Sequence, residues 1–208
     1  MASPRPGAER AIRQIDQPAK DAIRAEVRAS RAARTAEDRL ADDLARTGLL
    51  LAALDDWTPR MVAAYASTGD EPGTPDLLDA LVARGATVLL PVLSATVAGP
   101  RATAEWAVYE GRGSLRSGLW GIPEPTSGVL GVTAIEQAEL VVLPGMAGTV
   151  SGDRLGTGGG WYDRALVGTT SPRWMLLNDD ELYESVPLGP WDLPVSRIVT
   201  ATRVVRCR

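Results

Sequence analysis

The stretch Glu139–Leu166, ELVVLPGMAGTVSGDRLGTGGGWYDRAL, contains the pattern that decides the fold. It opens with an apolar run closed by Pro144 and Gly145, which is typical of a buried strand. Four glycines follow within Gly156–Gly160, and then the start of a helix in GWYDRALV. Glycine in an ordered element costs about 0.5–1 kcal/mol relative to alanine, so such a cluster indicates a close approach to the backbone. In an open α/β sheet this order places the glycines at the carboxyl edge of the strand, where ligands bind.

The rest of the chain alternates in the same way. Pro18 lies near the start of one predicted helix, Thr35 and Asp38 form a capping-box-like start to a second, and Thr74 and Gly85 bound a third. We expect helices over 18–34, 35–54 and 74–85, a short helix before the strand that ends near 146, and strands over 61–67, 86–93, 105–110, 173–178 and 196–205. This pattern predicts the α/β class, with a mainly parallel central sheet flanked by helices. Residues 18–208 are expected to form a single layered domain, preceded by a mobile segment over 1–17.

Composition limits the function classes. The 208 residues carry a net charge of −4, which suggests neither a nucleic acid nor an acidic membrane surface as partner. We find no apolar run of membrane-spanning length and no secretory signal. With Cys207 as the single cysteine, a reducing cytoplasm is the expected compartment.

The absence of histidine restricts the chemistry further. It excludes histidine general bases, Ser-His-Asp systems and histidine-ligated zinc. Any metal must therefore have oxygen ligands, which favours magnesium or calcium.

The glycine-rich stretch is chemically suited to a nucleotide phosphate. Free backbone N–H groups and the N-terminus of the following helix can face an anion, Arg154 can contact a phosphate, and Asp163 can hold magnesium between phosphate oxygens. Neither a P-loop nor a dinucleotide fingerprint matches it. From composition alone, a surface loop with flexible glycines is an equally good interpretation.

GDRLGTGGGWYDRAL resembles the signature of the 5-formyltetrahydrofolate cyclo-ligase family, G-x-R-L-G-x-G-G-G-Y-Y-D-R-x-L. AKDAIRAEVRASRAAR resembles the basic first helix of that family, and GIPEP resembles its G-I-x-E-P element. AYASTGDEPGTPDLLDALVARGATVLLPVL and VPLGPWDLPVSRIVTAT resemble two further family elements, so the likeness covers about residues 18–205.

The resemblance implies a cytoplasmic, monomeric enzyme of folate one-carbon metabolism whose ligands are a reduced folate, ATP and Mg²⁺. Members of the family join the formyl oxygen of 5-formyltetrahydrofolate to the γ-phosphate of MgATP. N10 then attacks the activated carbon, and phosphate leaves to give 5,10-methenyltetrahydrofolate. This chemistry depends on positioning and charge neutralisation and needs no histidine.

The resemblance also assigns roles residue by residue. Catalytic roles fall to Arg154, Trp161 and Tyr162, and the metal ligands are Asp163 and Asp192. ATP binding falls to Lys20, Arg24, Arg154, Leu155, Gly156, Thr157, Gly158, Gly159, Gly160, Trp161 and Tyr162. Folate binding falls to Ala66, Glu71, Trp106, Thr157, Gly158, Gly159, Gly160 and Trp161.

Each assignment has a simpler alternative. Lys20 and Arg24 also fit a solvated basic stripe, Glu71 and the two aspartates fit turn or cap residues, and Trp106 fits the core.

The chain departs from the family pattern at several positions. Gly148 and Thr149 replace an aromatic residue and a carboxylate, and Trp161 replaces a tyrosine. Gly189 stands for a glutamate and Trp191 for a histidine. These changes leave open a second hypothesis, that of a diverged paralogue which binds nucleotide or folate without this turnover, or acts on another substrate.

Overall fold

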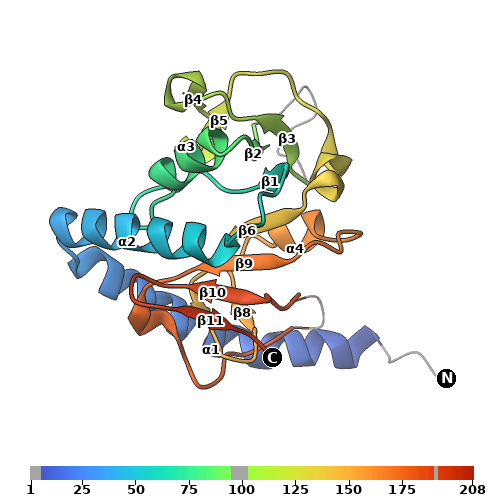
Figure 1. The fold of residues 1–208 in the computed structure, drawn as a ribbon. Coiled ribbons are helices and arrows are strands. Elements are labelled where there is room, and N and C mark those ends of the chain that lie inside the picture. Colours follow the sequence, from blue (N-terminus) through green and yellow to red (C-terminus); the bar gives the residue numbers. More distant parts are fainter. Residues whose placement is uncertain (1–5, 95–102, 190–191) are drawn as a thin grey trace.

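A computed structural model describes residues 6–94, 103–189 and 192–208, with side chains from residue 17 onward. A seven-stranded sheet with the order β11-β10-β9-β6-β1-β2-β3 forms its centre (Figure 1). Its strands are β1 Met61–Ala63, β2 Thr87–Val92, β3 Glu105–Val108, β6 Leu140–Pro144, β9 Arg173–Leu176, β10 Arg197–Val199 and β11 Val204–Arg206. The helices are α1 Pro6–Ala33, α2 Ala36–Leu54, α3 Pro75–Ala83 and α4 Trp161–Ala165.

The central strands β2, β1, β6, β9 and β10 are parallel to one another, and in this sheet only the two edge pairs, β2–β3 and β10–β11, are antiparallel. The predicted fold class is therefore confirmed. One strand prediction was wrong, because residues 196–205 form two strands rather than one. Between them the Thr200 hydroxyl accepts hydrogen bonds from the N–H groups of Thr202 and Arg203, and this turn reverses the chain.

Alternate residues of the central strands enter two separate cores, as the two-residue period of a strand requires. Val62 and Val142 pack with α2 and α3 on one face of the sheet. Ala63 and Val141 pack on the other face, with the 3₁₀ helix η3 (Val132–Gln137) and the chain around Leu166. The sheet is thus covered on both sides, which explains the continuous apolar runs of its strands.

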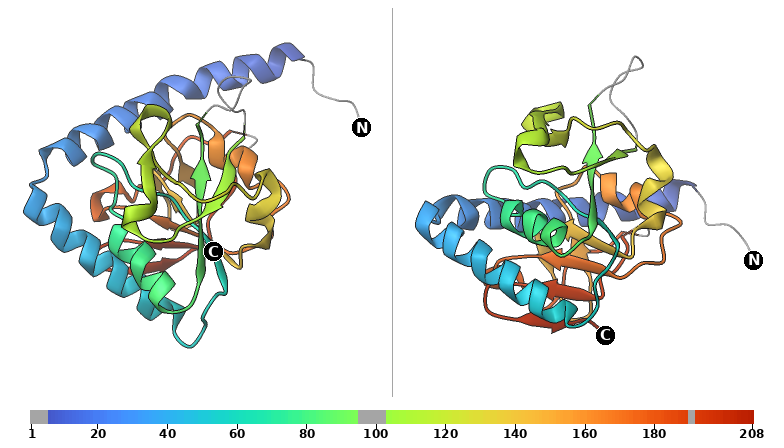
Figure 2. Two further views of the ribbon diagram at one scale, coloured as in Figure 1. Left: turned by 90° about the horizontal axis from the view of Figure 1, so that it is seen from above. Right: turned by 45° about the horizontal axis from the view of Figure 1, so that its top comes forward.

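The first two helices form a V whose arms diverge from residues 34–35 (Figure 2). The second begins as predicted, since the Thr35 side chain accepts a hydrogen bond from the Asp38 N–H. The first helix begins at Pro6 rather than near Pro18, which lies inside it. The helix formers Ala, Glu, Arg and Gln dominate residues 8–17 and favour this extension. Residues 1–5 of the segment expected to be mobile lie outside the described residues.

Small elements complete the fold. Two hairpins pair β4 (Leu115–Ser117) with β5 (Pro123–Pro125), and β7 (Ala147–Gly148) with β8 (Arg154–Leu155). Three further 3₁₀ turns are η1 Arg112–Ser114, η2 Leu119–Gly121 and η4 Asp179–Glu181. Within the described part of the chain, no helix combines the length and apolar character needed to cross a membrane.

Candidate active site

A cavity of about 660 Å³ opens at the carboxyl ends of the parallel strands. Ala66 follows β1, Leu93 follows β2, and Pro144 ends β6, and all three line it. This is the edge of the sheet at which open α/β folds bind ligands, and it is the position that the strand–glycine–helix order predicts.

The glycine-rich loop forms one wall of the cavity, and the close approach of a side chain explains why it contains glycine. Gly158 has φ +108°, and a Cβ atom there would lie 3.3 Å from the guanidinium carbon of Arg24. The Arg24 Nε donates a hydrogen bond to the Gly156 carbonyl at 2.9 Å. The group that approaches this backbone is therefore an arginine from α1, more than 130 residues earlier in the chain. The helix that follows the glycines, α4, has five residues, so the contribution of its N-terminus to anion binding stays a prediction.

Three cations that the sequence assigns to phosphate line this cavity, and each is held by a carboxylate. Lys20 Nζ lies 2.8 Å from Asp192 Oδ2, and Arg24 lies 2.8 Å from Asp21. Arg154 is 4% exposed and pairs with Asp163. Its Nε is buried and has no hydrogen-bond partner among the described residues. Buried donors of this kind usually have a partner, so a ligand acceptor is the expected one.

The predicted metal ligands Asp163 and Asp192 both line the cavity. Within residues 6–94, 103–189 and 192–208, no group of three or more acidic, cysteine or histidine side chains is arranged to hold a metal ion. Two carboxylates suit Mg²⁺, which takes few protein ligands and completes its shell with phosphate oxygens and water. The donor chemistry therefore fits magnesium bound together with a polyphosphate.

The other end of the cavity combines a carboxylate with aromatic rings. One oxygen of Glu71 accepts a hydrogen bond from the Thr68 N–H at 2.9 Å. Tyr162 and the fully buried Trp106 meet edge to face, with ring centroids 6.4 Å apart. Among the described residues, neither the Tyr162 hydroxyl nor the Trp106 indole nitrogen has a hydrogen-bond partner.

Tyr162 lines the cavity together with Glu71 and Arg154. Burial raises the pKa of its hydroxyl, the Glu71 carboxylate raises it further, and Arg154 opposes the shift. Both charges therefore act on the Tyr162 hydroxyl. A tyrosine hydroxyl is protonated at neutral pH, so it is a hydrogen-bond donor there.

The departures from the family pattern separate into two groups. Trp161 and Gly189 line the cavity. Gly148 and Thr149 are not among its lining residues. A Cβ atom at Gly148 would lie 2.5 Å from Met175 Cε, and the Thr149 hydroxyl donates to Asp153, so both positions serve packing and the turn before β8. Trp191 lies outside the described residues.

Trp161 has two neighbours that the sequence did not indicate. Its ring meets Trp120 edge to face at 6.1 Å, and the Arg164 guanidinium lies 5.3 Å from the ring centroid. Arg164 also donates to the Gly159 carbonyl at 3.1 Å.

The structure thus brings nearly all predicted site residues to one cavity. Gly159 is the exception among them, since it is not a lining residue. The lining residues that the sequence reading missed include Gln17, Tyr65, Thr68, Pro91, Ile122, Arg164 and Leu188. Arg164 and Thr68 could have been found, because Arg164 is a cation inside the quoted signature next to Asp163 and Thr68 is a polar residue three positions before Glu71. The others carried no chemical signal.

The sequence matches known proteins over most of its length. The family model of the 5-formyltetrahydrofolate cyclo-ligase family matches residues 16–201. The 5-formyltetrahydrofolate cyclo-ligase of Mycolicibacterium smegmatis is 37% identical over 146 residues, covering 69% of this chain and 75% of that protein. The Escherichia coli enzyme of the same name is 32% identical over 147 residues, covering 69% and 79%.

Solved structures agree on the fold. The 5,10-methenyltetrahydrofolate synthetase of Aquifex aeolicus superposes with a TM-score of 0.71 at 24% identity, covering 91% of this chain and 93% of that one. The synthetase of Mycoplasma pneumoniae gives 0.67 at 17% identity, covering 88% and 98%. The match of the family model and the identity to two curated enzymes establish that this chain is a ligase that belongs to the 5-formyltetrahydrofolate cyclo-ligase family.

Proposed function

We propose that this protein converts 5-formyltetrahydrofolate to 5,10-methenyltetrahydrofolate with MgATP. The formyl oxygen attacks the γ-phosphorus, and ADP leaves. N10 then attacks the activated formyl carbon and loses its proton. That attack closes the ring, and phosphate then departs with the former formyl oxygen, which leaves a cation shared between N5 and N10.

The cationic end of the cavity is the proposed triphosphate site. Lys20 and Arg24 from α1 and Arg154 from β8 supply three positive charges on one side of it. The buried Nε–H of Arg154 has no acceptor in the described part of the chain, and such a donor suits a phosphate oxygen. The loop Leu155–Tyr162 would cover the same phosphates with its backbone N–H groups.

Asp163 and Asp192 are the proposed ligands of Mg²⁺. The ion would offset negative charge on the phosphate oxygens as the γ-phosphoryl group transfers. In the structure the same two carboxylates neutralise Arg154 and Lys20.

The acidic end is the proposed folate site. Glu71 has the acceptor oxygens that the amino and ring N–H groups of a pterin require. Ala66, Trp106 and Trp161 would form the apolar walls, and Tyr162 would donate a hydrogen bond at the junction of the two ends. The single observation that carries this function is that one cavity is lined by Glu71, by Arg154 and by Tyr162, whose hydroxyl has no partner among the described residues, because the reaction joins a folate oxygen to a phosphate.

Purified protein mixed with MgATP and 5-formyltetrahydrofolate should develop the near-ultraviolet absorbance of the methenyl product. Reactions that lack ATP or contain a chelator of Mg²⁺ are the controls. Absence of product from protein that is folded would contradict the proposal.

The alternative function is a diverged paralogue, and the observation that favours it is the presence of Trp161 and Gly189 in the cavity. Trp161 offers an indole donor in place of a phenol hydroxyl. Binding of ATP by calorimetry without product formation would support this alternative. Robust turnover would exclude it.

A further inference from the structure

Beyond the cavity, a buried ion pair fixes α1 to the sheet. Arg31 donates from Nε and Nη2 to the two carboxylate oxygens of Glu181, at 2.6 and 2.8 Å. Its Nη2 also donates to the Gly145 carbonyl at 2.7 Å. Both side chains are almost fully buried, at 4% and 1% exposure. Arg31 therefore binds the segments that follow β6 and β9. Because its guanidinium group is planar and donates two hydrogen bonds to one carboxylate, it fixes the orientation of α1 as well as its distance from these segments.

The orientation of α1 matters because the helix face that carries Arg31 also carries two cations of the cavity. Lys20, Arg24 and Arg31 are separated by four and seven residues, which places them within about 40° around the helix axis. Arg31 thus sets the rotation and the axial position of the helix face that carries the two cavity cations. Val27, on the same face, adds apolar contact with Met146 and Leu155.

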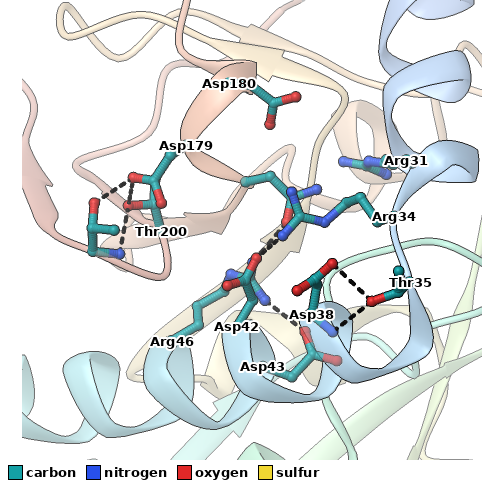
Figure 3. Close-up of polar contacts among 12 residues, drawn as sticks. Arg31, Arg34, Thr35, Asp38, Asp42, Asp43, Arg46, Asp179, Asp180 and Thr200 are labelled. Atoms are coloured by element: carbon teal, nitrogen blue, oxygen red, sulfur yellow. Dashed lines mark hydrogen bonds and ion pairs between the residues drawn. The ribbon is translucent and has the colours of Figure 1, made fainter.

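The contacts continue from Glu181 to helix α2, whose Arg46 and Asp43 side chains lie next to each other in Figure 3. Glu181 accepts hydrogen bonds from the backbone and side-chain N–H groups of Asn178, at 2.9 and 2.8 Å. The Asn178 side-chain oxygen accepts from Arg46 of α2 at 2.8 Å, and Arg46 also donates to the Leu177 carbonyl at 3.0 Å.

The last links reach the segment that carries Glu71. Asp43 accepts from Arg46 at 2.6 Å and from the Gly73 N–H at 2.7 Å. A Cβ atom at Gly73 would lie 2.0 Å from Asp43, so this approach requires glycine. An unbroken series of buried or half-buried polar contacts therefore joins the cationic wall to the acidic wall.

We propose that this series, Arg31–Glu181–Asn178–Arg46–Asp43–Gly73, is a positioning frame that holds Lys20 and Arg24 at a set distance from Glu71. The proposal rests on the proposed function, since those residues are its phosphate and folate contacts. Desolvation makes a buried ion pair a weak source of net stability, and apolar replacements of both partners are often equally stable. An apolar pair does not reproduce the fixed geometry of these hydrogen bonds. The frame therefore contributes the position of α1 rather than net stability.

The test compares Arg31→Met with the double variant Arg31→Met/Glu181→Met. The single variant leaves Glu181 buried without its cation and should lose thermal stability, whereas the double variant should recover much of it. The frame predicts that the double variant still has an apparent KM for ATP raised on the order of tenfold, with a smaller change in kcat. Arg34→Met removes the neighbouring, more exposed ion pair to Asp42 and should leave KM unchanged.

Hydrogen–deuterium exchange gives a readout that needs no turnover. The double variant should exchange faster over residues 18–26 and 67–74 at matched global stability. Wild-type KM and wild-type exchange in the double variant would overturn the frame. If that variant does not fold, Arg31→Lys replaces it, because lysine keeps the charge but cannot donate two parallel hydrogen bonds. The same rise in KM and the same faster exchange are expected. A wild-type protein without product would contradict the proposed function alone, because the exchange measurement still tests the frame.

Discussion

Replacing Arg154 with methionine tests the proposed phosphate site most directly. The side chain is buried, pairs with Asp163, and keeps its Nε–H without a partner among the described residues. Methionine preserves much of the volume while removing the charge and every donor. A hydrogen bond to a charged group contributes about 1.5–3 kcal/mol, and about 1.4 kcal/mol corresponds to a factor of ten. The Kd for ATP should therefore rise about 10- to 150-fold.

Part of that loss would come from Asp163, which the variant leaves without its cation beside a polyphosphate. The double variant Arg154→Met/Asp163→Asn removes this repulsion, so without Mg²⁺ it should bind ATP more tightly than Arg154→Met alone. The difference measures the coupling of the two residues. Arg154→Lys keeps the charge but loses the planar set of donors, and its Kd for ATP should lie between those of wild type and Arg154→Met.

Calorimetry with a non-hydrolysable ATP analogue is the assay, and the thermal midpoint of each variant reports its fold. Arg60→Met is the matched control, because its 91% exposed side chain pairs with Glu139 at the opposite edge of the sheet. That variant should bind ATP as wild type does. A folded Arg154→Met protein with a Kd within about twofold of wild type would refute the phosphate assignment, since that is under 0.5 kcal/mol.

Four further expectations follow from the site and the core. Asp163→Asn should lower kcat at least about tenfold and raise the Mg²⁺ concentration needed for half-maximal rate; an unchanged magnesium titration would make Asp163 a structural residue. Tyr162→Phe removes a buried hydroxyl that has no partner among the described residues, so thermal denaturation should show little or no loss of stability while turnover falls at least about tenfold; full activity would contradict the donor role. Trp161→Tyr should change kcat by about tenfold or less, which is about 1.4 kcal/mol, and a larger change in steady-state kinetics would point to a specific role of the indole. Burial and the Asp79 carboxylate raise the pKa of Tyr109 to about 12. Unfolded tyrosine ionises near pH 10, so this contribution to stability is complete below about pH 10 and is lost between about pH 10 and 12; denaturant titrations of Tyr109→Phe should show a shallower decline in that window.

Local signals were sufficient for most elements. Thr35 with Asp38 identified the start of α2, and the apolar run before Pro144 identified the strand β6, because caps and buried strands depend on a few consecutive residues. The sequence prediction was wrong where local helix propensity extended a helix or a turn divided a strand. Helix α1 continues through Pro18, and the final strand divides at Thr200.

The sequence by itself determined the family, the α/β class and the residue types available for chemistry. An ordered signature and the absence of histidine are properties of the chain that no folding can alter. It also identified Lys20, Arg24, Arg154 and Asp163 as candidates, although from motif position rather than from proximity.

Only the tertiary structure decided which of these side chains meet. Residues as distant as Lys20 and Asp192 form an ion pair because α1 crosses the carboxyl edge of the sheet, and that crossing depends on long-range contacts. The same packing places Tyr162, Glu71 and Arg154 in the lining of one cavity, which does not include Gly148 and Thr149. It also forms the buried Arg31–Glu181 pair, whose partners are 150 residues apart. Local sequence patterns do not predict such long-range pairs, since burial and charge compensation depend on how the whole chain packs.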